Sequence, residues 1–129
     1  MPINSRTKLP DGGGIVIAAI NANIDGNSSA VDGIVAHAGG GQALATPLTA
    51  YVNRVSVVAT GGDSVKLPPA VAGFTIIVVN ADGASMNLFP APGDQINTLG
   101  VNAAFPMVAG KVAFLIAAGS GQWHSILTA

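Results

Sequence analysis

Cysteine and glutamate are both absent from this 129-residue chain, and charged side chains of any kind are few. Without cysteine the protein has no disulfide, no thiolate metal site and no cysteine nucleophile. Glutamate and lysine are strong helix formers, so the lack of one and the scarcity of the other argue against long helices. Five basic residues stand against six aspartates, and this balance excludes the basic surface that a nucleic-acid-binding domain needs.

Aromatic residues and long hydrophobic runs are also scarce. Aromatic residues make up 5% of the chain, too few for a platform that stacks bases or sugars. The apolar run at 15–20 is six residues long, whereas a helix that spans a bilayer needs about 20. The N-terminus carries no apolar core of the kind found in signal peptides. We therefore expect a protein made in the cytoplasm, without membrane contact.

Small and β-branched residues supply most of the apolar mass. The chain contains 22 Ala, 14 Val and 11 Ile, and its 17 Gly and 8 Pro would interrupt any long helix. Valine and isoleucine favour sheets, because their branched side chains pack well on a pleated surface. Charged residues make up 9% of the chain, against about 25% in an average soluble domain. This composition predicts an all-β domain whose surface either consists largely of Ala, Ser, Thr, Asn and Gly or is covered by partners, and the second alternative fits a small, apolar domain that does not work alone.

Turn signals divide the chain into an N-terminal arm, residues 1–13, and a single β domain, residues 14–129. A short helix is possible near 42–51. Strands are predicted in eight segments: 14–20, 33–37, 53–59, 64–68, 74–80, 85–89, 111–119 and 123–127. The Gly61-Gly62 and Asp82-Gly83 pairs predict two hairpins. No repeat of fixed period stands out. Strands about ten residues apart predict an antiparallel β-sandwich or jelly roll.

One segment, residues 21–32, has the spacing of a calcium-binding loop. Asn21, Asn23 and Asp25 stand at alternate positions, Gly26 follows, and Asp32 falls at the twelfth position. Hard cations prefer oxygen ligands at such alternate residues. However, the first position is Asn, the twelfth is the short Asp, and two carboxylates give little charge. We therefore expect a polar turn here rather than a metal site.

Catalytic constellations have no positive support in the sequence. His37 and His124 are 87 positions apart, and no nearby cluster supplies a third metal ligand. No serine elbow or Ser-His-Asp set is recognisable, and the glycine runs lack the lysine of a phosphate-binding loop. We expect each histidine to face solvent or a subunit contact. The prediction is a protein that is not an enzyme and uses no cofactor.

Residues 62–97, GDSVKLPPAVAGFTIIVVNADGASMNLFPAPGDQIN, resemble a segment that recurs in small structural proteins of tailed bacteriophages. The preceding ATPLTAYVNRVSVVAT (45–60) and the closing AGSGQW (118–123) fit the same pattern. The resemblance thus covers residues 45–123. Similar segments occur in capsid decoration proteins, also called cement or head-stabilising proteins, and in fibre or tail-associated proteins.

The resemblance implies a virion structural protein located on the capsid surface. Such decoration proteins bind the major capsid protein as homotrimers and stabilise the shell, often through an extended arm. The arm would be residues 1–13, and the candidates for partner contacts are Arg6, Lys8, Arg54 and Trp123. The strands at 74–80 and 111–117 would form either the core or the trimer contact. The alternative is a trimeric fibre or tail-associated module that binds a host receptor, and a third class, a small hydrolase or metal-dependent binding protein, depends on residues 21–32 alone.

Overall fold

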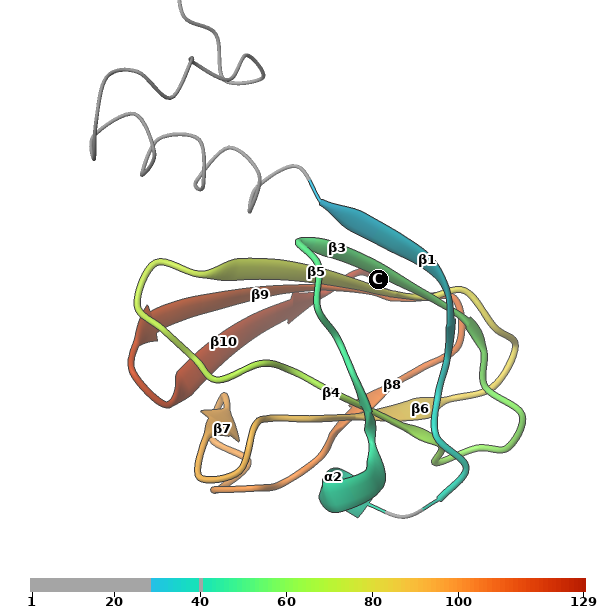
Figure 1. The fold of residues 1–129 in the computed structure, drawn as a ribbon, viewed down its shortest axis with the longest axis horizontal. Helices are drawn as coiled ribbons and strands as arrows, with labels where there is room; N and C mark the ends of the chain where they lie inside the picture. The colour runs from blue at the N-terminus through green and yellow to red at the C-terminus, as the bar shows by residue number, and fades with distance from the viewer. Residues whose placement is uncertain (1–28, 40) are drawn as a thin grey trace, which may run out of the picture.

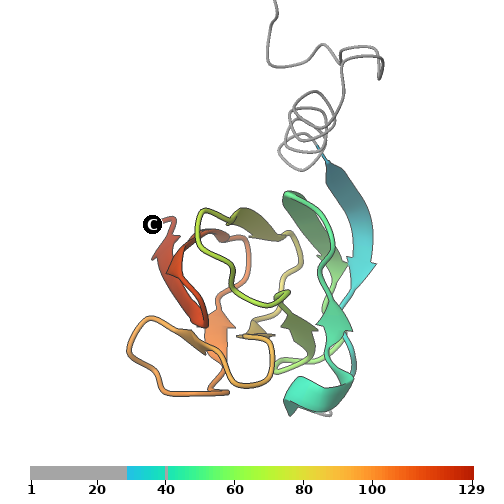
Figure 2. The same cartoon turned by 60° about the vertical axis from the view of Figure 1, so that its left-hand side comes forward.

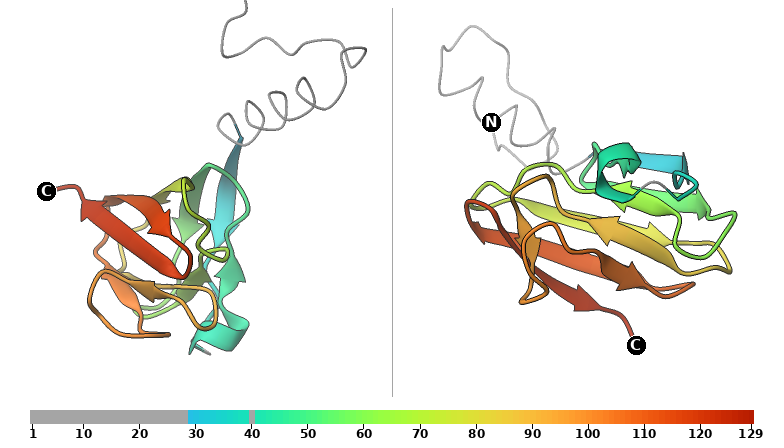
Figure 3. Two further views of the ribbon diagram at one scale, coloured as in Figure 1. Left: turned by 90° about the vertical axis from the view of Figure 1, so that its left-hand side faces the viewer. Right: turned by 90° about the horizontal axis from the view of Figure 1, so that it is seen from below.

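The computed structural model describes residues 29–39 and 41–129, which form two stacked β-sheets around one core (Figure 1). The larger sheet has six strands, in spatial order β1 (Ala30–Val35), β3 (Val52–Val57), β5 (Thr75–Asn80), β9 (Val112–Gly119), β10 (Gln122–Leu127) and β7 (Gln95–Ile96). The smaller sheet has four, in the order β2 (Thr46–Pro47), β4 (Ser64–Lys66), β6 (Met86–Phe89) and β8 (Phe105–Met107). Figure 3 shows the two layers end-on and from below.

The chain winds as a short β-solenoid, because it passes from one sheet to the other after nearly every strand (Figure 2). In the larger sheet β1, β3 and β5 are parallel neighbours, and in the smaller sheet β2, β4 and β6 are parallel neighbours. Each coil therefore contributes one strand to each layer. Two strands then run antiparallel to these, with β9 beside β5 and β8 beside β6.

This topology confirms the all-β prediction and overturns its finer form. An antiparallel sandwich or jelly roll was wrong, since both sheets are mixed. The two predicted hairpins were also wrong. The Gly61-Gly62 turn leads from β3 into β4 and the Asp82-Gly83 turn leads from β5 into β6, so each turn crosses between sheets instead of pairing its flanking strands. The predicted turn before residue 123 does form a hairpin, in which β9 and β10 pair antiparallel.

A repeat that the sequence hides appears in the coil register. Ala30 pairs with Val52 and Val52 with Ile77, which are offsets of 22 and 25 residues. In the smaller sheet Thr46 pairs with Val65 and Ser64 with Asn87, at offsets of 19 and 23. The coils thus repeat in space without a fixed period in the sequence. The unequal offsets explain why no fixed period was visible.

Corner aspartates join successive coils. Each of three carboxylates accepts a hydrogen bond from a backbone N–H located 24 positions earlier, Gly39 to Asp63 (3.3 Å), Val58 to Asp82 (2.7 Å) and Ala70 to Asp94 (2.8 Å). A corner leaves backbone N–H groups without a ladder partner, and an unpaired polar group costs free energy when it is buried. The carboxylates satisfy these groups, so aspartate beside glycine marks corners of the solenoid as well as turns.

The core lies between the two sheets and contains two asparagines among aliphatic side chains. Val55, Leu88 and Leu115 are fully buried, as expected for inward positions of alternating strands. Asn53 and Asn80 are equally buried, at 0% exposure. Asn53 bonds the backbone of Ala50 in both directions, its Oδ1 accepting at 3.1 Å and its Nδ2 donating at 2.7 Å, so the polar groups are satisfied locally.

Local predictions had mixed outcomes. Most predicted strands exist, and the short helix is limited to α2 (Gly41–Leu44), because Pro47 already belongs to β2. Val55 points inward as expected, but Val57 is 40% exposed and Val58 is the buried residue, so the alternation shifts at the end of β3. The arm, 1–13, and the strand predicted at 14–20 lie outside the described residues. Within the described part of the chain, no helix is long and apolar enough to span a membrane.

Candidate interaction surface

The outer face of the six-stranded sheet, on the side away from the core, is largely apolar. Alternation along β5 buries Ile76 and Val78 and turns Ile77 and Val79 outward. The same alternation along β9 buries Leu115 and leaves its two neighbours, Phe114 and Ile116, 41% and 47% exposed. Both strands therefore carry apolar side chains on both faces, one set in the core and the other set at the surface.

Four of the outward side chains form a row across the sheet. Val52 is the register partner of Ile77, Ile77 of Phe114, and Phe114 of Ile126. Directly opposed side chains on neighbouring strands lie about 5 Å apart at Cβ, so each of the four is close to the next. Ile126 is 67% exposed, the most of any large hydrophobic residue in the described chain. We call Val52, Ile77, Phe114 and Ile126 the apolar row.

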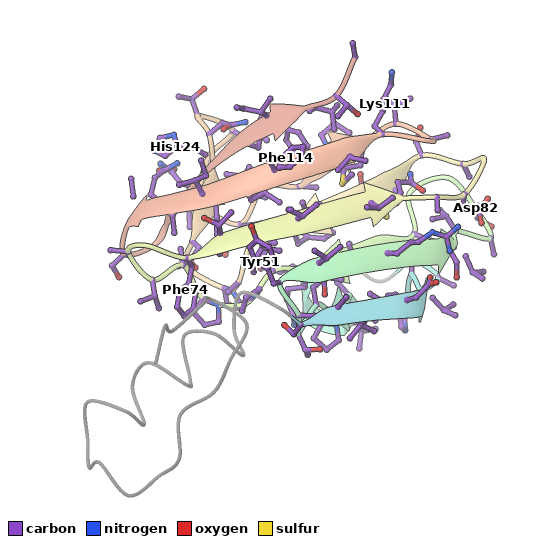
Figure 4. The ribbon with its side chains drawn as sticks, turned by 90° about the horizontal axis from the view of Figure 1, so that it is seen from above. Tyr51, Phe74, Asp82, Lys111, Phe114 and His124 are labelled. Atoms are coloured by element: carbon purple, nitrogen blue, oxygen red, sulfur yellow. The ribbon has the colours of Figure 1, made fainter. Side chains whose placement is uncertain are left out.

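Apolar side chains flank the middle of the row along β5 and β9, and charged side chains lie at one end of the strands. Figure 4 shows Phe114 over the middle of the sheet, with Lys111 and Asp82 at one end of the strands and Tyr51 and Phe74 toward the other. Phe74 is 47% exposed and extends the apolar area. An apolar centre with a polar rim is typical of protein–protein interfaces.

An ion pair neutralises the side of the face formed by β1 and β3. Arg54 Nη1 lies 2.8 Å from Asp32 Oδ1, and both side chains are well exposed. The hydrogen bond from Arg54, followed by that from the backbone N–H of Gly33, lowers the pKa of Asp32 below its ordinary value. An exposed pair of this kind contributes little to stability. Its consequence for the surface is that neither charge is left uncompensated.

The candidate metal loop is not assembled by the described residues. Asn21, Asn23 and Asp25 lie outside them, and Asp32, the twelfth position, belongs to β1. The carboxylate of Asp32 is already occupied by the guanidinium of Arg54. Among residues 29–39 and 41–129, no three His, Cys, Asp or Glu side chains are grouped so that they could hold a metal ion.

The four candidates for partner contact fall into three groups. Arg6 and Lys8 lie outside the described residues. Arg54 is at the surface, on the outer face, although its charge is paired. Trp123 was a wrong choice, because it is 0% exposed and belongs to the core, where the inward alternation of β10 places it. Its indole Nε1 is buried without a hydrogen-bond partner in the described chain.

The two histidines are exposed, as expected. His37 is a bridge residue that exchanges backbone hydrogen bonds with Ser64, and its Nδ1 lies 3.3 Å from the carbonyl oxygen of Gly39. His124 is on β10, in register with Ile116 of the outer face (Figure 4). Neither histidine is close to a grouped set of acids in the described structure.

The apolar row is the functional candidate that residue-by-residue reading of the sequence missed. The signal was present, because the strands at 74–80 and 111–117 were recognised as apolar on both faces, with the core and a trimer contact as alternatives. The structure places their alternate residues in both environments, in the core and at the surface. What the sequence did not reveal is that β3 and β10 extend the exposed side of these strands into one surface.

The resemblance of residues 45–123 to phage structural proteins remains a prediction. The residues that carry it, such as the Pro68-Pro69 pair and the Asp94 corner, are strand and turn formers, and these determine a fold more directly than a role. Comparisons with known proteins identified no relative that would support the resemblance. No protein-family model matches the chain, and no curated protein or solved structure is significantly similar to it.

Proposed function

We propose that the protein is a non-enzymatic structural component of a bacteriophage virion, a capsid decoration protein that assembles as a homotrimer on the outer capsid surface. The observation that carries the proposal is the apolar row, a hydrophobic strip across the sheet that is half-buried at Val52 and Ile77 and exposed at Phe114 and Ile126. Large apolar patches on small soluble proteins mark sites of association. The resemblance of residues 45–123 identifies the class of protein that would use such a site.

The low charge of the chain fits a protein that works within an assembly. With 9% charged residues, much of its surface is Ala, Gly, Ser, Thr and Asn. On a lattice, each copy contacts the capsid protein and its own neighbours, so weak contacts add up. Linked binding sites raise overall avidity by about 10²–10⁴ without any new contact. A decoration protein therefore needs extended surfaces of moderate binding affinity more than it needs one deep pocket.

The experiment that tests the proposal locates the protein on the particle. Virions of the phage that encodes the chain are labelled with a gold-conjugated antibody raised against residues 41–129, and then imaged by electron microscopy. Gold spread over the head supports decoration, and gold at the tail or fibres replaces decoration with the receptor-binding alternative. Particles that stay unlabelled, while the same antibody detects the purified protein, would contradict a virion role.

A second measurement separates decoration from internal capsid functions. Purified protein is mixed with undecorated capsids of the same phage and sedimented. Binding that saturates at a fixed number of copies per capsid is expected, because the lattice offers a defined set of equivalent sites. Absence of co-sedimentation at saturating protein would contradict attachment to the outer surface.

A further inference from the structure

We propose that the outer face of the six-stranded sheet is the surface through which copies of this chain contact one another, with the apolar row at the centre of the contact. The inference deepens the proposed function and rests on it for self-assembly. It specifies the surface used for self-association, and capsid binding would then use another part of the molecule.

The row is suited to packing because its shape is fixed before association. Val52, Ile77, Phe114 and Ile126 stand on four neighbouring strands whose backbones are joined by the sheet hydrogen bonds. β-branched and aromatic side chains have few rotamers, so little conformational entropy is lost when they are covered. Phe114, at the centre of the strip, is the kind of aromatic anchor that dominates binding energy at interfaces.

The size of the face is adequate for a stable contact. Five neighbouring strands, β1, β3, β5, β9 and β10, have six to eight residues each. At about 3.3 Å per residue and about 4.8 Å between strands, they cover roughly 500 Å² of flat area before side-chain relief is counted. Each partner in a stable complex of standard size buries about 800 Å². Full coverage by another copy therefore approaches that value.

The charge of the face favours a copy over a charged partner. Arg54 and Asp32 neutralise one another at the β1 and β3 side of the face, and none of the four residues of the apolar row is charged. Over the row, a strongly charged partner would lose hydration without meeting an opposite charge. A second copy brings an equally uncharged apolar strip, so neither repulsion nor uncompensated desolvation opposes the contact.

The test changes the most exposed residue of the row and measures the mass in solution. Wild type, Ile126→Lys and the control Leu44→Lys are compared by sedimentation equilibrium over a wide concentration range. Leu44 is 60% exposed and belongs to α2, at the side of the molecule opposite the outer face (Figure 1). We expect wild type and the control to form the same oligomer, and the Ile126→Lys dissociation constant to rise at least about tenfold, which is about 1.4 kcal/mol.

Folding is checked for each variant by far-UV circular dichroism, and Phe114→Ser replaces Ile126→Lys if that variant is not folded. A monomeric wild type at every concentration would overturn the inference, as would an oligomer that both row variants leave intact. A trimer that Ile126→Lys dissociates supports the inference together with the proposed trimer. A dimer that it dissociates supports the inference and contradicts the trimer, whereas gold labelling of virions decides the capsid role independently.

Discussion

Replacement of Asn80 by alanine should destabilise the protein more than any exposed substitution, because its side chain links three segments inside the core. Asn80 is the last inward residue of β5 and is 0% exposed. Its Nδ2 donates to the carbonyl oxygens of Ala84, at 2.9 Å, and Met107, at 3.1 Å. Its Oδ1 accepts from the backbone N–H of Asp82 at 3.2 Å. The amide thus joins the corner after β5 to β8 in the other sheet.

The magnitude follows from the three bonds and their burial. A hydrogen bond contributes about 1 kcal/mol net, and a buried group left without a partner costs about 1–3 kcal/mol. The bond to Met107 is wholly buried, so Asn80→Ala leaves that carbonyl oxygen unsatisfied. We expect a loss of about 3–4 kcal/mol in the free energy of unfolding. At about 3–5 °C per kcal/mol for a domain of this length, the melting temperature should fall by about 10 °C or more.

Urea denaturation followed by fluorescence provides the assay, because the chain has a single tryptophan, Trp123, that is fully buried. Asn87→Ala is the matched control: its Nδ2 makes one exposed contact with the carbonyl oxygen of Gly62, at 3.4 Å. The control should stay within about 0.5 kcal/mol of wild type. If the free energy of unfolding of Asn80→Ala also stays within about 0.5 kcal/mol of wild type, with an unchanged dependence on urea concentration, the three hydrogen bonds do not have the stabilising role assigned to them.

Two further substitutions test a corner and a turn. Hydrogen bonds from Val58 and Gly83 lower the pKa of Asp82 from 3.8, so its carboxylate stabilises the fold above that pH and the contribution is lost as the pH falls below it. Thermal melts should therefore show the largest difference in melting temperature between wild type and Asp82→Asn at neutral pH and a smaller difference below pH 3.8. A difference in melting temperature that is constant with pH would contradict this role of the carboxylate. Gly121 has φ +77°, so Gly121→Ala should cost about 1–2 kcal/mol in urea unfolding. Gly83→Ala, without positive φ and with open space around it, should change stability by less than about 0.5 kcal/mol, and equal effects of the two would be inconsistent with a backbone cause.

The longer strands could be located from the sequence, whereas β2, β7 and β8 and most strand partners could not. Runs of Val and Ile located β5 and β9, since these residues favour a pleated, buried surface. The partner of a strand depends on where the following corner sends the chain. Gly61-Gly62 and Asp82-Gly83 suit a hairpin reversal equally well as a passage into the second sheet. The choice is made by contacts about 24 residues away, such as the bond from Val58 to Asp82.

The candidate surface was partly predictable for a related reason. Recognition of two strands as apolar on both faces came from local composition, and it correctly left the core and a contact surface as alternatives. Trp123 was misplaced because an isolated aromatic residue suits an interface and a core equally well, and only the inward position on β10 decides between them. Ile126, three residues later and on the opposite face, was the exposed apolar residue of that strand.

The parallel coils also explain why the exposed apolar face can persist in a stable protein. In a β-solenoid the inward residues of each strand fill the core, and corner aspartates and buried asparagines join one coil to the next. Outward residues do not fill the core, although opposed pairs such as Ile77 and Phe114 add cross-strand contacts at the surface. Ile77, Phe114 and Ile126 nevertheless form one continuous strip across three neighbouring strands. An exposed apolar strip of this kind is typical of surfaces that a partner covers, which is the basis of the proposed contact between copies.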